Sequence, residues 1–304
     1  MFRYSYVLTY HYTVEPLINT SSNTLPDPDA ESKQRSLLLC DRIRSACNRS
    51  DGSMRFSDFM NIALYEPGLG YYSGGLKKFG EKGDFITSPE VSPLFGQCLA
   101  NQLAEILANF KKINNNKSYV IEFGAGSGVL AVHILLRLEL LDFLPEKYFI
   151  LELSAELKQR QKETIKEKAP HLLTRVQWLN YMPEKLTNAV VVANEVLDAM
   201  PVECFRVAEN KIETLMVAME DDRLVSHYAP ATEEIIRKVS TIQQRSEITL
   251  PTGYCSEYNP AISAWLASIA SGAENLVILL IDYGYNEQEY YHSDRDHGTL
   301  MCYY

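Results

Sequence analysis

The stretch YVIEFGAGSGVLAVHIL, residues 119–135, joins a short apolar run, one acidic residue, three glycines and an apolar helical pattern. The run at 119–123 predicts a buried strand, and the residues from 129 onward predict a helix. A strand that leads through a glycine-rich turn into a helix presents free backbone N–H groups at the carboxyl edge of a sheet. The stretch therefore predicts a ligand site in an α/β fold.

Apolar runs and helical runs alternate after this stretch. Almost wholly apolar strands separated by helices are typical of a parallel sheet that is covered on both faces. The predicted strands are 119–123, 148–153, 175–179, 189–193 and 275–285, and the predicted helices between them include 129–141 and 154–168. The alternation predicts a doubly wound, Rossmann-like α/β fold.

Three regions are expected along the 304 residues. Residues 1–30 end in the polar, proline-bearing run NTSSNTLPDPDA and are predicted to be a disordered tail. Residues 31–112 are predicted to form an N-terminal helical and lid region, in which Ser92 and Pro93 begin a helix. Residues 113–304 are predicted to form the α/β domain, with an antiparallel β-ribbon inserted at about 202–228.

The glycine spacing and two acidic residues indicate the ligand class. The dinucleotide fingerprint G-x-G-x-x-G needs a third glycine at position 129, which is Val129 here. A carboxylate at Glu122 would repel a pyrophosphate and attract the cationic S-adenosylmethionine, while Glu152 at the next strand tip is placed for ribose hydroxyls in either class. We predict S-adenosyl-L-methionine as the cofactor, with a nicotinamide dinucleotide as the alternative; the loop glycines are Gly124, Gly126 and Gly128.

The segment ANEVLDAMPV, residues 193–202, follows the predicted strand at 189–193 and faces the same crevice. It carries no Asn/Asp-Pro-Pro-aromatic signature of nucleobase amine methylation, and its carboxylates suit a cationic acceptor such as a guanidinium, whose fork they can orient. The candidate catalytic residues are Glu195, Asp198 and Asn194. The structural alternative is that Asp198 caps a turn and Glu195 bonds a neighbouring backbone amide.

Composition excludes several classes of protein. The formal charge is −10 and no basic run exceeds two residues, which argues against a nucleic-acid surface. Apolar runs are far shorter than the roughly 20 residues of a membrane helix. Six scattered cysteines suit a reducing compartment, so we expect a cytoplasmic protein. The run HSDRDH, residues 292–297, is interpreted as a solvated loop and no metal site is predicted.

Several further segments, in order, resemble the MidA family of class I S-adenosylmethionine-dependent methyltransferases. They include FMNIALYEPGLGYYSGG, KFGEKGDFITSPEVSPLFGQCLA, ANEVLDAMPV, DYGY and HGTLMCYY. The resemblance implies a protein arginine methyltransferase, with mitochondrial members that assist assembly of respiratory complex I. It implies that a lid containing Thr87 and Pro89 folds over the cofactor and that Asp282 lies near the acceptor.

Family members continue beyond the segment that resembles HGTLMCYY, through another helix and an antiparallel edge pair. The resemblance therefore implies that C-terminal edge strands are missing here and that one sheet edge is bare, which favours a homodimer. Three function hypotheses follow: a methyltransferase acting on a protein arginine, an NAD-dependent oxidoreductase, and an inactive methyltransferase-fold protein that serves in assembly or interaction.

Overall fold

The computed structural model describes residues 28–74, 87–114, 117–209 and 211–301. The chain divides into two compact units. The first unit comprises residues 1–74, 200–260 and 284–304, and the second comprises 75–199 and 261–283. The second unit contains the glycine-rich stretch and the candidate site, so it is described first.

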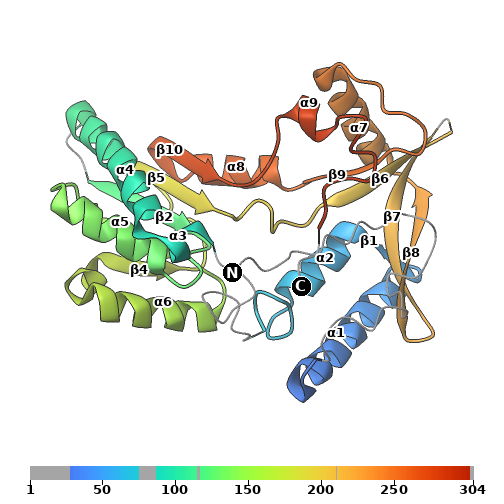
Figure 1. Cartoon of the computed structure of the whole chain (residues 1–304), viewed down its shortest axis with the longest axis horizontal. Helices are drawn as coiled ribbons and strands as arrows, with labels where there is room; N and C mark the ends of the chain where they lie inside the picture. Colours follow the sequence, from blue (N-terminus) through green and yellow to red (C-terminus); the bar gives the residue numbers. More distant parts are fainter. Residues whose placement is uncertain (1–27, 75–86, 115–116, 210, 302–304) are drawn as a thin grey trace. The chain divides into compact units, whose positions relative to one another are not determined.

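The second unit is built on a five-stranded parallel sheet in the order β10-β5-β2-β3-β4 (Figure 1). All four pairings in this sheet are parallel, with the first strand of the unit, β2, in the middle. This arrangement confirms the predicted doubly wound α/β fold. The strands are β2 (Ser118–Phe123), β3 (Lys147–Leu151), β4 (Val176–Leu179), β5 (Leu186–Asn194) and β10 (Ala273–Ile281).

Helices cover the two faces of this sheet, as the alternation of elements requires. Alternate residues of β2 show the division, because Val120 packs in the cluster with α4, α5 and η1, while Ile121 packs in the cluster with α8. Each fully buried aliphatic side chain of this kind contributes roughly 1.5–3 kcal/mol. The helices are α3 (Ser88–Val91), α4 (Pro93–Asn114), α5 (Val129–Leu140), α6 (Ala155–Lys168), the 3-10 helix η1 (Pro170–Arg175) and α8 (Ile262–Ala270).

Two of these helices begin at hydroxyl side chains. The Ser92 hydroxyl accepts a hydrogen bond from the Leu94 amide at 3.2 Å, and α4 starts at the following Pro93. The Ser154 hydroxyl accepts from the Leu157 amide at 3.3 Å at the start of α6. Such caps satisfy amides that have no partner in the first helical turn.

A buried amide cluster holds the amino end of the sheet together. Asn188 on β5 is fully buried, and its side-chain oxygen accepts hydrogen bonds from Asn114 and Asn275 at 3.1 and 3.0 Å. Its side-chain nitrogen donates to the Asn114 side chain at 3.0 Å and to the Lys117 carbonyl at 3.3 Å. The cluster thereby joins α4, β5 and β10 at the edge opposite the glycine loop.

Replacement of Asn188 by leucine should destabilise the second unit by about 2–3 kcal/mol, because several buried polar groups lose a partner at once. Urea unfolding followed by circular dichroism measures the change. Asn101→Leu is the matched control, since Asn101 is exposed and its side-chain oxygen accepts a hydrogen bond from Arg137 at the surface. Equal destabilisation by the two variants would contradict the assigned role of the cluster.

The first unit contains a five-stranded antiparallel sheet. The central strand is β7, and β8 pairs with its residues 213–220. The strands β6 and β1 pair with residues 211–214 and 216–218 of β7, respectively, and β9 pairs with β6. Within the described residues of this unit, four helices accompany the sheet. The elements are α1 (Ala30–Arg49), β1 (Ser53–Arg55), α2 (Phe56–Tyr65), β6 (Glu203–Ala208), β7 (Lys211–Glu220), β8 (Arg223–Pro230), α7 (Glu233–Ser246), β9 (Cys255–Tyr258) and α9 (Glu287–Tyr290).

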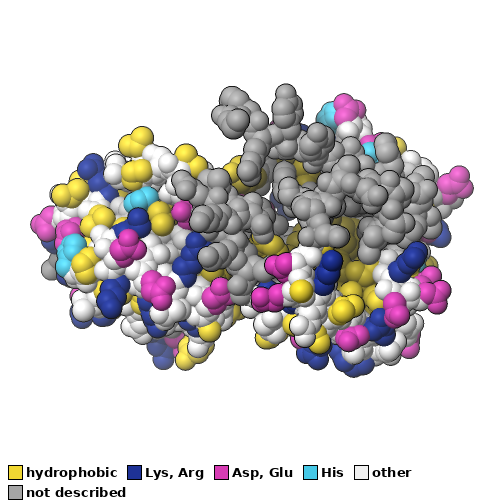
Figure 2. Space-filling model, turned by 60° about the horizontal axis from the view of Figure 1, so that its bottom comes forward, with side chains coloured by type: hydrophobic (Ala, Val, Ile, Leu, Met, Phe, Trp, Pro, Cys, Tyr) yellow, Lys and Arg dark blue, Asp and Glu magenta, His cyan; other side chains and the backbone are white. Residues whose placement is uncertain are grey.

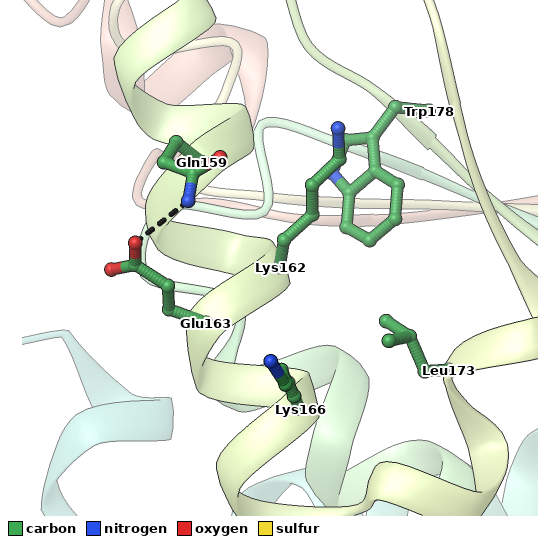
Figure 3. Close-up of a pocket in the computed structure, with 6 residues that line it drawn as sticks. All are labelled: Gln159, Lys162, Glu163, Lys166, Leu173 and Trp178. Carbon is green, nitrogen blue, oxygen red and sulfur yellow. Dashed lines mark hydrogen bonds between the residues drawn. The ribbon is translucent and has the colours of Figure 1, made fainter.

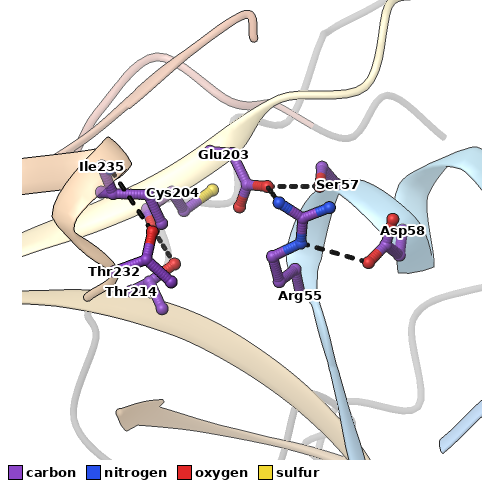
Figure 4. Close-up of polar contacts among 8 residues, drawn as sticks. All are labelled: Arg55, Ser57, Asp58, Glu203, Cys204, Thr214, Thr232 and Ile235. Atoms are coloured by element: carbon purple, nitrogen blue, oxygen red, sulfur yellow. Dashed lines mark hydrogen bonds and ion pairs between the residues drawn. The ribbon is translucent and has the colours of Figure 1, made fainter. Parts of the chain in front are cut away.

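A buried carboxylate ties α2 to this sheet (Figure 4). Glu203 on β6 is 2% exposed and accepts a hydrogen bond from the Ser57 hydroxyl at 2.6 Å. Arg55 lies 3.2 Å from the same carboxylate and 3.3 Å from Asp58. Burial raises the pKa of Glu203, and the Ser57 hydrogen bond and the Arg55 charge oppose that rise. The contacts of Glu203 with Ser57 and Arg55 therefore hold the junction of β1 and α2 against β6.

The two units do not follow the region boundaries expected from the sequence. Residues 31–74 group with the β-ribbon, because β1 pairs with β7 and the buried side chains of Ile43, Cys47 and Met54 pack with Val217. The ribbon itself is present at 203–230 as β6, β7 and β8. The predicted tail lies outside the described residues up to position 27, and Ala30 already begins α1 with Asp29 as its N-cap.

Surface charge, cysteine state and helix hydropathy are the features on which the expectations from composition depend. Figure 2 shows lysine and arginine side chains scattered among acidic ones on the face that it presents. The five cysteines within the described residues are all free thiols. In the described part of the chain, helices long and apolar enough for a membrane crossing are not found.

Candidate functional site

The glycine loop, residues 124–128, turns from β2 into α5 through three left-handed residues. Gly124, Gly126 and Gly128 have φ of 62°, 52° and 85°, a region that costs other L-residues about 1–2 kcal/mol. A Cβ on Gly124 would lie 3.1 Å from the Val196 side chain, and a Cβ on Gly128 would lie 3.1 Å from Cα of Gln161. The loop therefore needs glycine for its backbone path and for close contact with two neighbouring segments.

Glu122 lies one residue before the end of β2 and is 1% exposed. Its Oε2 accepts a hydrogen bond from the Tyr148 hydroxyl at 2.7 Å. Its Oε1 has no hydrogen-bond partner among the described residues. Burial raises the pKa of Glu122 to about 7, with the Tyr148 hydrogen bond lowering it and the nearby Glu152 charge raising it further. A buried acceptor of this kind is suited to a cation.

Glu152 follows β3 at the same edge of the sheet and is 8% exposed. Its Oε1 accepts from the Ser154 amide at 2.9 Å, and its Oε2 accepts from the Gln161 side-chain nitrogen at 3.0 Å. Burial raises the pKa of Glu152, while these two hydrogen bonds oppose the rise. Each oxygen keeps acceptor capacity, as hydrogen bonding to ribose hydroxyls would require.

The short helix α3 connects the predicted lid with the glycine loop and with the tip of β5. Glu90 accepts a hydrogen bond from the Ser127 hydroxyl in the loop. The backbone of Ser88 hydrogen-bonds the Glu195 carboxylate. Thr87 is the N-cap residue of α3 and Pro89 is buried within it, whereas the lid residues 84–86 lie outside the described residues.

A group of carboxylates lies where β5 and β10 end. Glu195 directly follows β5, adopts a left-handed φ of 52°, and its amide donates to the Ile281 carbonyl at 2.9 Å. The Asn194 side-chain nitrogen donates to Glu195 Oε1 at 3.3 Å. Asp282 directly follows β10, and its Oδ2 accepts from the amides of Leu197 and Asp198 at 2.7 and 3.3 Å. Asp282 thus holds the turn that carries Asp198.

The carboxylates of this acidic group repel one another, which adds to the effect of burial in raising the pKa values of two of them. The Asp198 residue is exposed to solvent. Its pKa is nevertheless raised to about 6, first by partial burial of the carboxyl group and then by the charges of Asp282 and Glu195. Burial also raises the pKa of Glu195, with the Asp282 charge adding to the rise. Backbone hydrogen bonds, with Ala199 for Asp198 and with Ser88 for Glu195, oppose these rises in pKa.

The described residues fit the cofactor that the sequence predicts. Glu122 offers an unpartnered buried acceptor, Glu152 offers acceptor capacity at the next strand tip, and the loop glycines leave the backbone open. The acidic group of Glu195, Asp198 and Asp282 is joined to this region through Val196, which contacts Gly124. A cationic cofactor and a cationic acceptor can therefore lie at neighbouring carboxylates.

A separate surface pocket lies between α6, η1 and β4 (Figure 3). It contains none of the predicted site residues, and it is lined by Gln159, Lys162, Glu163, Lys166, Leu173 and Trp178. Trp178 joins this pocket to the site by donating its indole N–H to the Gln161 oxygen at 2.8 Å. In the described part of the chain, groups of three or more side chains able to hold a metal ion are not found.

Comparison with known proteins identifies the family. Residues 98–304 match the family model of candidate S-adenosyl-L-methionine-dependent methyltransferases. The chain belongs to this family. The match spans the glycine loop and both acidic strand tips, and it confirms the resemblance to MidA-like methyltransferases and the predicted cofactor class.

Solved structures and curated relatives support the same assignment. A methyl transferase candidate from Burkholderia thailandensis, solved with S-adenosyl-homocysteine bound, is 37% identical, with a TM-score of 0.82 over 92% of this chain and 71% of that chain. Protein arginine methyltransferase NDUFAF7, mitochondrial, of Danio rerio is 26% identical over 77% of this chain and 59% of its own length. The human protein of the same name is 34% identical over 40% of this chain and 28% of its own length. The chain thus spans less than two thirds of the curated relatives that it matches.

Gly126→Val should abolish binding of S-adenosyl-homocysteine, because the left-handed loop would be strained and a side chain would occupy its ligand face. Isothermal titration calorimetry measures the affinity. Gly52→Val is the matched control, since Gly52 has φ of 91° in a turn with open space around it. Unchanged affinity in Gly126→Val would refute the loop assignment.

Glu122→Gln should stabilise the ligand-free protein at pH 8 relative to the unsubstituted chain, but not at pH 5. The pKa of Glu122 rises from 4.5 to about 7 on folding, so its contribution is favourable below about pH 4.5 and is lost as pH rises through about 7. The expected difference between the two pH values is on the order of 2 kcal/mol. Urea unfolding measures it, with Glu105→Gln on the exposed face of α4 as control. A pH-independent difference would contradict the buried ionisation.

Proposed function

We propose that this chain transfers a methyl group from S-adenosyl-L-methionine to an arginine side chain of a protein. The observation that carries the proposal is the acidic group of Glu195, Asp198 and Asp282 beside the glycine loop. Carboxylates that repel one another when empty gain free energy when a cation lies among them. A guanidinium is such a cation, and its planar fork can pair with two carboxylates at once.

The cofactor would be held by the residues on the β2 and β3 side of the sheet edge. Glu122 would accept from the cofactor's ammonium group, and Glu152 would accept from the ribose hydroxyls. The backbone of Gly124, Gly126 and Gly128 would approach the ligand closely. The α3 segment with Thr87 and Pro89 would close this side, since Glu90 already bonds the loop at Ser127.

Glu195 and Asp198 would orient the acceptor, and Asn194 would hold the Glu195 carboxylate through its 3.3 Å hydrogen bond. In the proposed reaction a guanidinium nitrogen forms the new N–CH₃ bond as the C–S⁺ bond breaks, S-adenosyl-homocysteine leaves, and one proton is lost from the acceptor. Alignment of the nitrogen lone pair with the methyl carbon would supply most of the rate enhancement. Asp198, with its raised pKa, is placed to take the released proton.

The names of relatives support the choice of arginine on a protein. Relatives from fish, fly and human are named protein arginine methyltransferases, at identities of 26%, 33% and 34%. The MidA resemblance adds a subunit of respiratory complex I as the proposed protein substrate. The same relatives are described as mitochondrial, so we propose the matrix for a eukaryotic source and the cytoplasm otherwise.

The proposal is tested with radiolabelled S-adenosylmethionine and a protein extract from cells that lack this chain. The full chain should produce labelled methylarginine on acid hydrolysis. Asp198→Asn and Glu195→Gln should lower the rate at least about 100-fold while S-adenosyl-homocysteine binding stays unchanged. Asp142→Asn, at an exposed position after α5, is the matched control.

At subsaturating cofactor the rate reports the free enzyme, and it should rise with pH through about 6, because Asp198 must be ionised to pair with the guanidinium; Asp198→Asn should remove that dependence. Label on another amino acid would refute the arginine acceptor. Intact cofactor binding with no labelled protein would refute turnover and favour the hypothesis of a non-enzymatic interaction protein.

A further inference from the structure

Gln161 on α6 has a fully buried side chain, although most of its helix is charged and exposed. Every polar atom of its amide is hydrogen-bonded. The oxygen accepts from the Trp178 indole at 2.8 Å. The nitrogen donates to the Gly126 carbonyl at 3.1 Å and to Glu152 Oε2 at 3.0 Å. One side chain therefore joins the glycine loop, the carboxylate after β3 and the indole on β4.

The orientation of this amide is determined by its partners. An indole N–H can only donate, so the Gln161 oxygen must face Trp178. A backbone carbonyl and a carboxylate can only accept here, so the nitrogen must face Gly126 and Glu152. A rotated amide would set like groups against each other at all three contacts. The arrangement is specific to an amide, because a leucine of similar size would fill the space without any of these bonds.

We propose that Gln161 is a positioning residue that fixes the Glu152 carboxylate relative to the glycine loop, and that Trp178 sets the direction of its amide. The inference deepens the proposed cofactor site and rests on the placement of the nucleoside at Glu152. Ser154 holds one carboxylate oxygen and Gln161 holds the other, so the carboxylate plane is fixed while each oxygen keeps a lone pair for a ribose hydroxyl. The hydrogen bond from Gln161 to the Gly126 carbonyl holds the glycine loop at a fixed distance from Glu152.

Trp178 also borders the surface pocket of Figure 3, where its ring lies 5.2 Å from the Lys162 ammonium nitrogen. It acts on Glu152 and Gly126 through the Gln161 amide. Removal of the indole donor alone would leave the Gln161 oxygen without its partner and would weaken the preference for the observed amide direction, which Gly126 and Glu152 would then have to maintain by themselves. Trp178→Phe therefore tests the direction of the amide and retains an aromatic ring at this position.

The test measures the affinity of the full chain for S-adenosyl-homocysteine and for its 2′-deoxy analogue by isothermal titration calorimetry. Gln161→Leu should weaken binding of S-adenosyl-homocysteine about 10- to 100-fold, because a charge-assisted hydrogen bond and a loop contact are lost. The same substitution should weaken binding of the 2′-deoxy analogue by a factor that is several-fold smaller, because the analogue has no 2′-hydroxyl to donate to Glu152. Trp178→Phe should show the same pattern with about a 3- to 10-fold loss. Gln159→Leu, the same change on the exposed face of α6, should have no effect.

Gln161→Glu provides a readout that a purely structural role would not change. A carboxyl group beside Glu152 shares one proton with it, so the pair has a raised pKa. Only the protonated group can donate to Glu152 or Gly126. The affinity of Gln161→Glu, relative to that of the unsubstituted chain at each pH, should therefore rise as pH falls from about 8 to about 5.

Failure of this inference is distinguishable from failure of the proposed function. If the unsubstituted folded chain does not bind S-adenosyl-homocysteine, the proposed cofactor site is wrong. If it binds and Gln161→Leu binds within about twofold as well, the positioning role is refuted. An equal loss for both ligands, combined with a pH-independent Gln161→Glu ratio, would also refute it, because that result indicates packing alone.

Discussion

The parallel pairing of β10, β5, β2 and β3 is the constraint on which the site depends, because it brings the carboxyl ends of four strands to one edge of the sheet. Each of these strands has an acidic residue within one position of its end: Glu122, Glu152, Glu195 and Asp282. In the sequence they are separated by up to about half of the chain. The register of the sheet makes them neighbours, and no local element could do so. Burial raises the pKa of Glu122, Glu152 and Glu195, and neighbouring carboxylates add to the rise for Glu122 and Glu195; a cationic ligand would oppose it.

The carboxylates at this sheet edge differ in how many of their oxygen atoms already accept hydrogen bonds. Glu152 has a hydrogen-bond donor on each oxygen, from Ser154 and Gln161, whereas Glu122 keeps one oxygen without a partner in the described part of the chain. At the β5 and β10 tips Asp282 is occupied by backbone amides, and Asp198 remains accessible to solvent. A rigid, satisfied carboxylate suits recognition of neutral hydroxyls, while an incompletely satisfied one suits a charge.

Much of this could be predicted from the sequence, because strong local patterns match the fold. The apolar runs at 119–123 and 189–193 and the caps at Ser92 and Ser154 lie where the structure has them. The short strands β1 and β9 were not predicted, since three or four residues carry no period and form only by pairing with distant partners. Gln161 lies in a predicted helix rich in charged residues, where nothing local distinguishes it from Gln159. Its role depends on Trp178 and Gly126, which only the tertiary fold brings near.

The charges of the cofactor and of the proposed acceptor would account for the number of carboxylates at one edge. S-adenosylmethionine carries a sulfonium and an ammonium against one carboxylate, and the guanidinium that we propose as acceptor would add another positive charge beside the sulfonium. Two cations at bonding distance repel each other, and in a partly desolvated crevice that repulsion is stronger than in water. Glu195 and Asp198 would offset it only when ionised, and a bound cationic cofactor would lower the raised pKa values of these two groups. Cofactor binding would thus prepare the acidic group for its acceptor through the field of the sulfonium alone, with no change of backbone conformation required.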